Sequence, residues 1–279
     1  MSNERRDSDG PVVPESEFGR IPGRLRAGFS SERGRREVNP FVDKIQEFRP
    51  WVVVGEDAEG FKGRWREVMG VGQEAPLVLE IGPGNGFFFR DLAARRPEAA
   101  VVGVEIRFKR VWMTAKKALD AGCTNFRVMH QSFGYLDTYF DTGELTEVYI
   151  NHPDPWPKGK HHKHRLLQPT FGAMLASRLA PGGLVQVQSD FVPYGPLSRS
   201  VFANEMWERV AHTADLHGAP DDDPDAVLLR TDHITTNYES KKILEGERIF
   251  VGRYRRTSAP ARRPTAAEEL AALDAVVLP

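Results

Sequence analysis

Short apolar runs recur along this chain, and polar or glycine-containing turns separate each run from the next. Runs that are apolar at consecutive positions are typical of strands buried on both faces of a parallel sheet. Leu77–Ile81 is the clearest example, because only Glu80 interrupts it. Seven segments of this kind predict strands, over residues 77–81, 100–105, 125–130, 147–151, 184–190, 226–230 and 248–254.

Most segments between these runs contain helix formers in amphipathic patterns. Arg107–Ala121, for example, is followed by Gly122, a favourable C-terminal helix cap. Helices are predicted over residues 87–96, 107–121, 166–179, 194–209 and 266–273. Strands that alternate with helices predict an α/β fold, here a doubly wound, mostly parallel, seven-stranded sheet in a single Rossmann-like domain.

The chain has 279 residues, of which 40% are hydrophobic, enough for one sizeable domain with extensions. We predict a disordered tail over 1–19, an arginine-rich arm and pre-core element over 20–70, the main domain over 71–257 and a tail over 258–279. No apolar run approaches the length that crosses a bilayer, and the N-terminus lacks the apolar core of a signal peptide. These features predict a cytoplasmic protein without a membrane partner.

Charge is balanced over the whole chain, with a formal net charge of −1, but it is locally uneven. From Arg20 to Arg36 the sequence holds six arginines against one acid, Glu32. A flexible arginine-rich arm of this kind can become ordered on an RNA backbone. The alternative interpretation is a solvated tail.

A glycine-rich turn follows the first predicted core strand. Gly82, Gly84 and Gly86 allow a tight turn whose backbone can approach a ligand closely, and a helix is predicted directly after it. Strand, glycine turn and helix form the nucleotide site of open α/β sheets. The next strand ends at Glu105, where a carboxylate can accept hydrogen bonds from both hydroxyls of a ribose.

A proline-rich loop follows the fourth predicted strand, at the sheet edge where open α/β folds place their sites. It presents Asp154 and Trp156 and then a dense basic run that includes several histidines. We predict no metal site here, because no cysteine or carboxylate completes a ligand set and the neighbouring cations repel a metal ion. A basic loop that binds phosphate is the simpler interpretation.

Two motifs carry a resemblance to a known family. EIGPGNG, residues 80–86, resembles motif I of the class I S-adenosylmethionine-dependent methyltransferases. NHPDPWPKGKHHKHRLLQ, from Asn151 onward, resembles the signature of the tRNA (guanine-N7-)-methyltransferase family. The resemblance covers roughly residues 20–255 and implies methyl transfer from S-adenosylmethionine to N7 of guanine-46 in the variable loop of tRNA.

The resemblance also implies roles for individual positions. The cofactor residues would be Glu80, Gly82, Gly84, Gly86 and Glu105, with Gln131 and Ser132 as neutral acceptors near the adenine. Asp154 would be catalytic, and the substrate contacts would be Lys158, Asp190, Thr236 and Glu239. The residues that contact RNA would be Arg24, Arg26, Lys160, Lys163 and Arg165.

The implied reaction is chemically simple, because N7 of guanine carries a lone pair and no proton. The enzyme must therefore align the reacting atoms, which is catalysis by proximity. Asp154 or Asp190 could accept hydrogen bonds from the exocyclic amine or N1–H of the guanine. Trp156 could stack on the base, or it could pin the proline loop to the core.

The sequence departs from the family pattern at three places. No acid follows the third strand, His152 stands where an apolar residue is usual, and His164 stands where an arginine is usual. Two alternatives therefore stay open: a divergent class I methyltransferase acting on another RNA or a small molecule, and a non-catalytic RNA-binding paralogue. The protein is expected to be a monomer or a homodimer.

Overall fold

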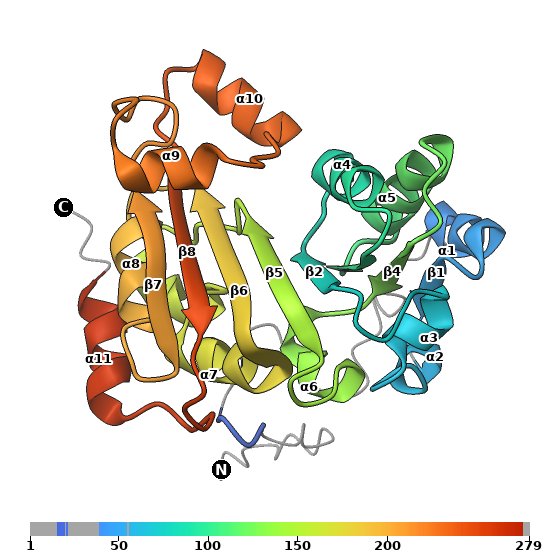
Figure 1. The fold of residues 1–279 in the computed structure, drawn as a ribbon, viewed down its shortest axis with the longest axis horizontal. Helices are drawn as coiled ribbons and strands as arrows, with labels where there is room; N and C mark the ends of the chain where they lie inside the picture. Colours follow the sequence, from blue (N-terminus) through green and yellow to red (C-terminus); the bar gives the residue numbers. More distant parts are fainter. Residues whose placement is uncertain (1–15, 20, 22–38, 55, 276–279) are drawn as a thin grey trace, which may run out of the picture.

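The computed structural model describes residues 16–19, 21, 39–54 and 56–275, and within them eight strands form one sheet (Figure 1). Their spatial order is β1-β4-β3-β2-β5-β6-β8-β7. All neighbours from β1 to β6 pair in parallel, whereas β8 is antiparallel to both β6 and β7. The strands are β1 (Val52–Val54), β2 (Leu77–Ile81), β3 (Ala100–Glu105), β4 (Phe126–His130), β5 (Leu145–Asn151), β6 (Leu179–Ser189), β7 (Trp207–Thr213) and β8 (Phe250–Arg256).

Helices cover both faces of the sheet, as expected of a doubly wound fold. One apolar cluster joins the sheet to α1, α4 and α5, and a second joins it to α3, α6, α7, α8 and α11. The helices are α1 (Pro40–Lys44), η1 (Ile45–Phe48), α2 (Glu56–Glu59), α3 (Trp65–Met69), α4 (Phe87–Arg95), α5 (Phe108–Asp120), η2 (Phe133–Tyr135), α6 (Leu136–Tyr139), η3 (Gly159–His164), α7 (Pro169–Arg178), α8 (Tyr194–Val201), α9 (Pro224–Arg230), α10 (Asn237–Leu244) and α11 (Ala266–Asp274).

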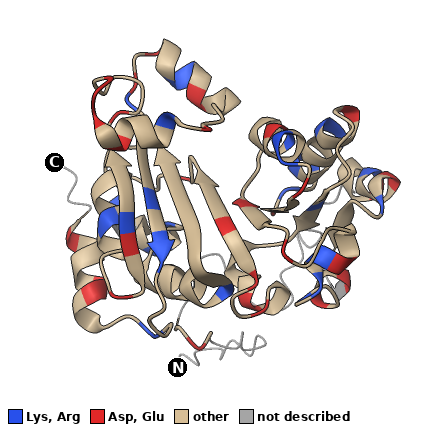
Figure 2. Cartoon of the chain, in the orientation of Figure 1, with Lys and Arg blue, Asp and Glu red and all other residues tan. Residues whose placement is uncertain are grey.

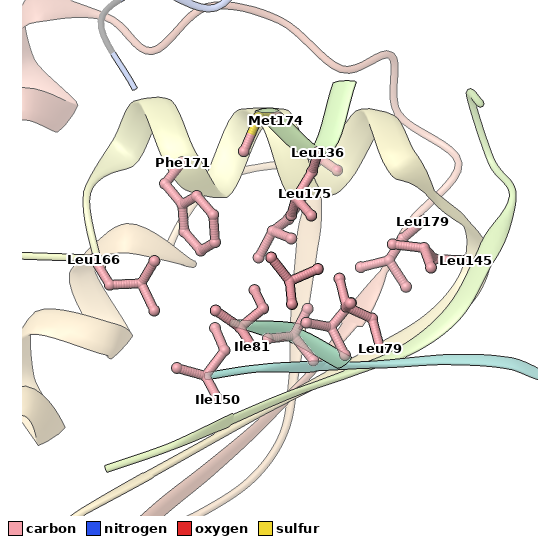
Figure 3. Close-up of a cluster of buried hydrophobic side chains, with 14 of the residues drawn as sticks. Leu79, Ile81, Leu136, Leu145, Ile150, Leu166, Phe171, Met174, Leu175 and Leu179 are labelled. Atoms are coloured by element: carbon pink, nitrogen blue, oxygen red, sulfur yellow. The ribbon is translucent and has the colours of Figure 1, made fainter. Parts of the chain in front are cut away.

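The larger apolar cluster fixes the central strands against α7. Leu79 and Ile81 of β2 and Ile150 of β5 lie beneath Phe171 and Leu175 of α7 (Figure 3). Every residue of β2 is buried, which explains why its sequence is almost continuously apolar. This packing places the ends of β2 and β5 rigidly beside each other.

The sheet contains eight strands rather than the predicted seven, and three segments account for the difference. Residues 226–230 form helix α9 instead of a strand, because Asp223 caps the helix through the backbone N–H of Ala226 and Pro224 occupies its first turn. The predicted helix over 194–209 ends at Val201, and Trp207–Thr213 pairs with β8 as an edge strand. Val52–Val54 adds a further strand beside β4.

The two ends of the described chain pack on the domain. Phe18 and Ile21 belong to the larger core cluster, and α11 lies against α7 and α8 (Figure 1). Of the predicted tail over 1–19, residues 1–15 lie outside the described residues, as do Arg24 and Arg26 of the arginine-rich arm. Figure 2 shows acidic and basic residues interspersed over the helices and strands of the described chain. Each helix in the described part is too short or too polar to span a membrane.

Candidate active site

A cavity of about 430 Å³ opens where β2, β5 and β6 end. Its walls are the glycine turn with the start of α4, the proline loop after β5, the residues after β6, and the start of α10 (Figure 1). The strand order reverses between β2 and β5, and ligands of open α/β sheets bind at such a switch point.

The glycine turn forms the floor of this cavity. Gly82, Gly84 and Gly86 have φ values of +71°, +57° and +76°, a left-handed conformation that favours glycine. At Gly86 a Cβ atom would lie 2.5 Å from the Cα atom of Thr114, so any side chain there would collide with α5. The turn therefore presents bare backbone to the cavity, as the glycine spacing predicted.

Glu80 and Asn151 form a pair of hydrogen-bond acceptors at the back of the cavity. Asn151 Nδ2 donates to Glu80 Oε1 at 3.0 Å, and burial raises the pKa of Glu80 to about 8. Glu80 Oε2 and Asn151 Oδ1 are buried and lack a hydrogen-bond partner among the described residues. Two unpaired acceptors, one of them an oxygen of the Glu80 carboxyl group, fit a cationic donor such as the ammonium group of an amino acid.

Glu105 closes β3 beside the glycine turn but does not line the cavity itself. Its Oε1 accepts from the backbone N–H of Arg107 at 2.9 Å, and its Oε2 lies 3.9 Å from Arg110 Nη1. Burial raises the pKa of Glu105, while these donors oppose that shift. Ile106, the next residue, is 53% exposed, and sequence reasoning missed this apolar surface beside the strand-end acid.

Gln131 and Ser132 lie after β4, outside the lining of the cavity. Gln131 Nε2 donates to the Tyr139 hydroxyl, and Gln131 Oε1 accepts from the backbone N–H of Ser132. The Ser132 hydroxyl accepts from the backbone N–H of Gly134 and so caps η2. Both side chains therefore have local structural partners in addition to any ligand contact.

The proline loop carries Asp154 into the cavity on a well-supported backbone. The Asp154 carboxylate is exposed, and no described residue donates a hydrogen bond to it. The buried Tyr194 hydroxyl donates to the Asp154 carbonyl oxygen at 2.5 Å. Burial raises the pKa of Tyr194, so its proton stays available for this bond.

Arg165 has a different environment from the one expected of an RNA contact. Its side chain is 4% exposed, and Nη2 donates to the carbonyl oxygens of Trp156 and Pro157 at 3.0 and 3.4 Å. The prediction that Arg165 contacts RNA is therefore corrected: its guanidinium is buried under the proline loop and stabilises the loop backbone. The proline run removes backbone donors, and a buried arginine supplies donors in their place.

The remaining basic residues follow this loop on η3. Lys158 and Lys163 are exposed, whereas the side chain of Lys160 lies outside the described residues. Trp156 does not line the cavity; its ring lies 5.1 Å from the ring of His164 and 5.7 Å from that of His161. The loop therefore points its carboxylate inward and its aromatic and basic groups outward.

Asp190, directly after β6, lines the same cavity as Asp154. His152 Nδ1 lies 3.3 Å from Asp190 Oδ1, and the Tyr238 hydroxyl donates to Asp190 Oδ2 at 3.2 Å. Burial would raise the pKa of Asp190, but the hydrogen bonds from His152 and Tyr238 lower it overall. Tyr238 is 46% exposed and lines the cavity, an aromatic surface that the sequence did not reveal.

Thr236 and Glu239 form the capping box of α10. Thr236 lines the cavity, but Glu239 is fully buried behind it. Glu239 Oε1 accepts from His217 Nε2 at 2.7 Å and from His233 Nε2 at 2.8 Å. These three side chains are of the types that ligate metals and lie within 4.8 Å of one another, a grouping that sequence spacing did not predict.

Comparison with known proteins shows which proteins this chain is similar to. A family model described as "Putative methyltransferase" matches residues 74–251. The tRNA (guanine-N(7)-)-methyltransferase of Geobacillus kaustophilus is 31% identical over 211 residues, covering 75% of this chain and 90% of the relative. The tRNA (guanine-N(7)-)-methyltransferase of Photobacterium profundum is 30% identical over 258 residues, covering 91% of this chain and 98% of the relative. Among solved structures, the 16S rRNA methyltransferase KamB superimposes with a TM-score of 0.47 and 13% identity, covering 85% of this chain and 99% of that one.

Proposed function

We propose, because this chain belongs to the tRNA (guanine-N(7)-)-methyltransferase family, that it transfers a methyl group from S-adenosylmethionine to N7 of a guanine in tRNA. One observation carries the proposal most directly. The unpaired acceptors of Glu80 and Asn151, above the glycine turn, share a single cavity with Asp154 and Asp190. That cavity can bind a cationic cofactor and a hydrogen-bond donor side by side.

The cofactor residues are those of the glycine turn and the two strand-end acids. Glu80 and Asn151 would accept from the ammonium of S-adenosylmethionine, and Glu105 would accept from the ribose hydroxyls. Gly82, Gly84 and Gly86 leave room for close contact. Gln131 and Ser132 would be neutral acceptors near the adenine. When bound, S-adenosylmethionine supplies a methyl carbon already activated by a sulfonium charge.

The guanine would be held from the opposite wall. Guanine N7 needs no base to remove a proton, so the protein's contribution is to orient the ring toward the methyl carbon. Asp154 and Asp190 would accept from guanine N1–H and the exocyclic amine. Tyr238, which donates to Asp190, offers an aromatic face in the same cavity on which the base would stack.

The RNA backbone would contact the surface outside this cavity. Lys158 and Lys163 on the exposed side of the proline loop, together with Lys160, would neutralise phosphates near the target base. Arg24 and Arg26 of the arm would extend the same contact. By resemblance, the methylated position would be guanine-46 in the variable loop.

A labelling experiment tests the function. The protein is incubated with S-adenosylmethionine carrying a labelled methyl group and an unmodified tRNA transcript, and the RNA is then cleaved chemically at 7-methylguanosine. We expect label in the tRNA and one cleavage site in the variable loop. Label elsewhere in the RNA would indicate a divergent methyltransferase, and cofactor binding without labelling would indicate a non-catalytic paralogue.

A Glu105→Ala variant tests the cofactor site in the same assay. The substitution removes charge-assisted hydrogen bonds that are worth about 1.5–3 kcal/mol each. Affinity for S-adenosylmethionine, measured by calorimetry, should fall at least tenfold in a folded variant. Unchanged affinity would remove Glu105 from the cofactor site.

A further inference from the structure

His152 occupies an unusual backbone position in the wall of the cavity. Its φ is +48°, in the left-handed region that few residues other than glycine adopt. Its side chain is only 6% exposed, and its backbone N–H donates to the carbonyl oxygen of Gln188 on β6 at 2.9 Å. Strained backbone conformations cost free energy and cluster at functional sites.

The side chain of Gln188 links His152 to the capping box of α10. Glu239 Oε2 accepts from Gln188 Nε2 at 3.2 Å, and the same Gln188 Nε2 lies 3.3 Å from His152 Nε2. On its other side, His152 Nδ1 lies 3.3 Å from Asp190 Oδ1. The result is a continuous hydrogen-bonded row of side chains from Glu239 through Gln188 and His152 to Asp190.

The protonation state of Glu239, at one end of this row, determines where the protons lie along it. Burial would raise the pKa of Glu239, but hydrogen bonds from His233 and His217 lower it to about 2, so Glu239 is an ionised acceptor. Gln188 must then turn its NH₂ group toward Glu239, because a reversed amide would place two oxygens 3.2 Å apart without a proton between them.

The amide orientation in turn fixes the protonation state of His152. An NH₂ group is a donor only, so His152 Nε2 must accept and carries no proton. The proton of the neutral ring is therefore on Nδ1, where it points to Asp190 Oδ1. This arrangement leaves Gln188 Oε1 as a buried acceptor without a described partner, which is a smaller penalty than an unpaired donor.

We propose that His152 is a positioning residue for Asp190, acting as a neutral imidazole with its proton on Nδ1. This inference rests on the proposed function, because it assumes that Asp190 orients the guanine. A second proton, on Nε2, would face the NH₂ group of Gln188 donor to donor. The ring would then turn, and Asp190 would lose the hydrogen bond that directs it.

Other charged groups surround this row of side chains and contribute to any pH dependence of kcat. Asp190 also receives the Tyr238 hydroxyl, and Lys242 Nζ lies 3.7 Å from its Oδ2, both from α10. Further charged residues line the cavity that His152 faces: Glu80, Arg110, Asp154, Lys241 and Glu247. Among the described residues, the recorded hydrogen-bond neighbour of His152 Nε2 is Gln188, so a proton added at that atom meets the Gln188 NH₂ group and also places a positive charge beside Asp190.

Nitrogen NMR of the histidine side chains tests the protonation state of His152 without an activity assay. In ¹⁵N-labelled protein at pH 8, His152 should give the pattern of a neutral ring protonated on Nδ1. Its signals are identified by their loss in a His152→Asn variant. A ring protonated on Nε2 instead, or doubly protonated at this pH, would overturn the inference.

Two variants then separate positioning from packing. His152→Asn keeps an N–H donor toward Asp190, cannot gain a proton and suits the left-handed backbone. His152→Phe keeps a ring but has no donor. At pH 8 we expect kcat of the Asn variant within about threefold of the native enzyme and kcat of the Phe variant at least tenfold lower, with KM for S-adenosylmethionine unchanged. Thermal unfolding of both variants shows whether either has lost its fold.

The pH profile is the decisive measurement. The native enzyme should lose kcat on the acidic side of its pH profile, and the Asn variant should not. A His212→Phe variant on β7, away from the cavity, is the control and should keep the native profile. If the Asn variant shows the native acidic limb, or the Phe variant keeps native kcat, the inference is wrong. A native enzyme inactive at every pH would refute the proposed function instead, and the NMR result would stand alone.

Discussion

The hydroxyl of Tyr194 donates a hydrogen bond to the backbone carbonyl oxygen of Asp154 at 2.5 Å. Tyr194 is fully buried in the first turn of α8, whereas Asp154 is exposed at the tip of the proline loop. The bond therefore connects the rigid core to the backbone of the proposed catalytic residue. It leaves the carboxylate of Asp154 free to contact substrate.

We predict that Tyr194→Phe impairs turnover more than it impairs folding. Loss of one hydrogen bond costs about 1 kcal/mol of stability. A loop that shifts by a fraction of an ångström can lose on the order of tenfold in rate. Single-turnover methylation of tRNA should therefore slow by about that factor, while calorimetry shows unchanged affinity for S-adenosylmethionine.

The matched control is Tyr254→Phe. The Tyr254 hydroxyl shares a buried hydrogen bond with Ser198 at 2.8 Å, on β8 and away from the cavity. This variant should lose similar stability, read as a lower Tm, and keep the native rate. Equal rate losses in both variants would mean that Tyr194 acts only through stability.

For Asp154→Asn we expect methylation to be lost with little change in stability. The carboxylate has no hydrogen-bond donor among the described residues, so the amide of asparagine disrupts no contact of the folded chain. Its effect should fall on kcat if Asp154 orients the guanine mainly in the reactive arrangement. Methylation and thermal unfolding are measured on the same preparation; full activity would exclude Asp154 from the reaction.

Cofactor binding should release a proton from Glu80. Burial raises the pKa of Glu80 to about 8, so at pH 7 the empty site holds mostly the neutral acid. A bound ammonium favours the carboxylate, which means that affinity for S-adenosylmethionine should rise with pH and level off above about pH 8. Calorimetry at pH 7 in buffers of different ionisation enthalpy should detect close to one proton released.

Glu80→Gln is the control for this linkage. It keeps the shape of the side chain but cannot release a proton, so its binding enthalpy should be far less dependent on the buffer. The same proton release in native and Gln proteins would show that another group is titrated.

Lys158 and Lys163 should behave differently from Arg165 in RNA binding. Each exposed lysine that contacts a phosphate contributes about 0.7–0.9 to the slope of log affinity against log salt. Lys158→Ala and Lys163→Ala should each reduce that slope for tRNA and leave Tm unchanged. Arg165→Ala should lower Tm instead, because it removes the donors to Trp156 and Pro157. If Arg165→Ala changes the slope without lowering Tm, its guanidinium contacts RNA after all.

The central part of the fold could be read from local sequence. The apolar run Leu77–Ile81, interrupted only by Glu80, became β2. The glycines after it form the tight turn that their spacing predicted, with left-handed φ values. Glu105, Asp154 and Asp190 lie at or just after strand ends for the same reason. In a parallel sheet, periodicity places a strand, and strand ends meet at one edge.

Other features depended on contacts between distant segments. Residues 226–230 and 207–213 have patterns compatible with either helix or strand, and the choice came from the Asp223 cap and from pairing with β8. Arg165 looked like one more member of a basic run, yet it is buried against carbonyl oxygens of its own loop. Charge in a sequence does not say which way a side chain points.

The proton arrangement around His152 is the clearest case of a feature that depends on contacts between distant segments. Residues 152, 188, 190 and 239 come from three separate segments of the chain, and no motif spacing predicts that they form a hydrogen-bonded row. Sheet register brings His152 beside Gln188, and the fold of α10 over β6 brings Glu239 to Gln188. The motifs at the strand ends carried the resemblance to a methyltransferase family, and that resemblance implied the reaction class. Which atoms donate and which accept was decided by tertiary packing, since a hydrogen bond depends on distance and direction that only the folded chain defines.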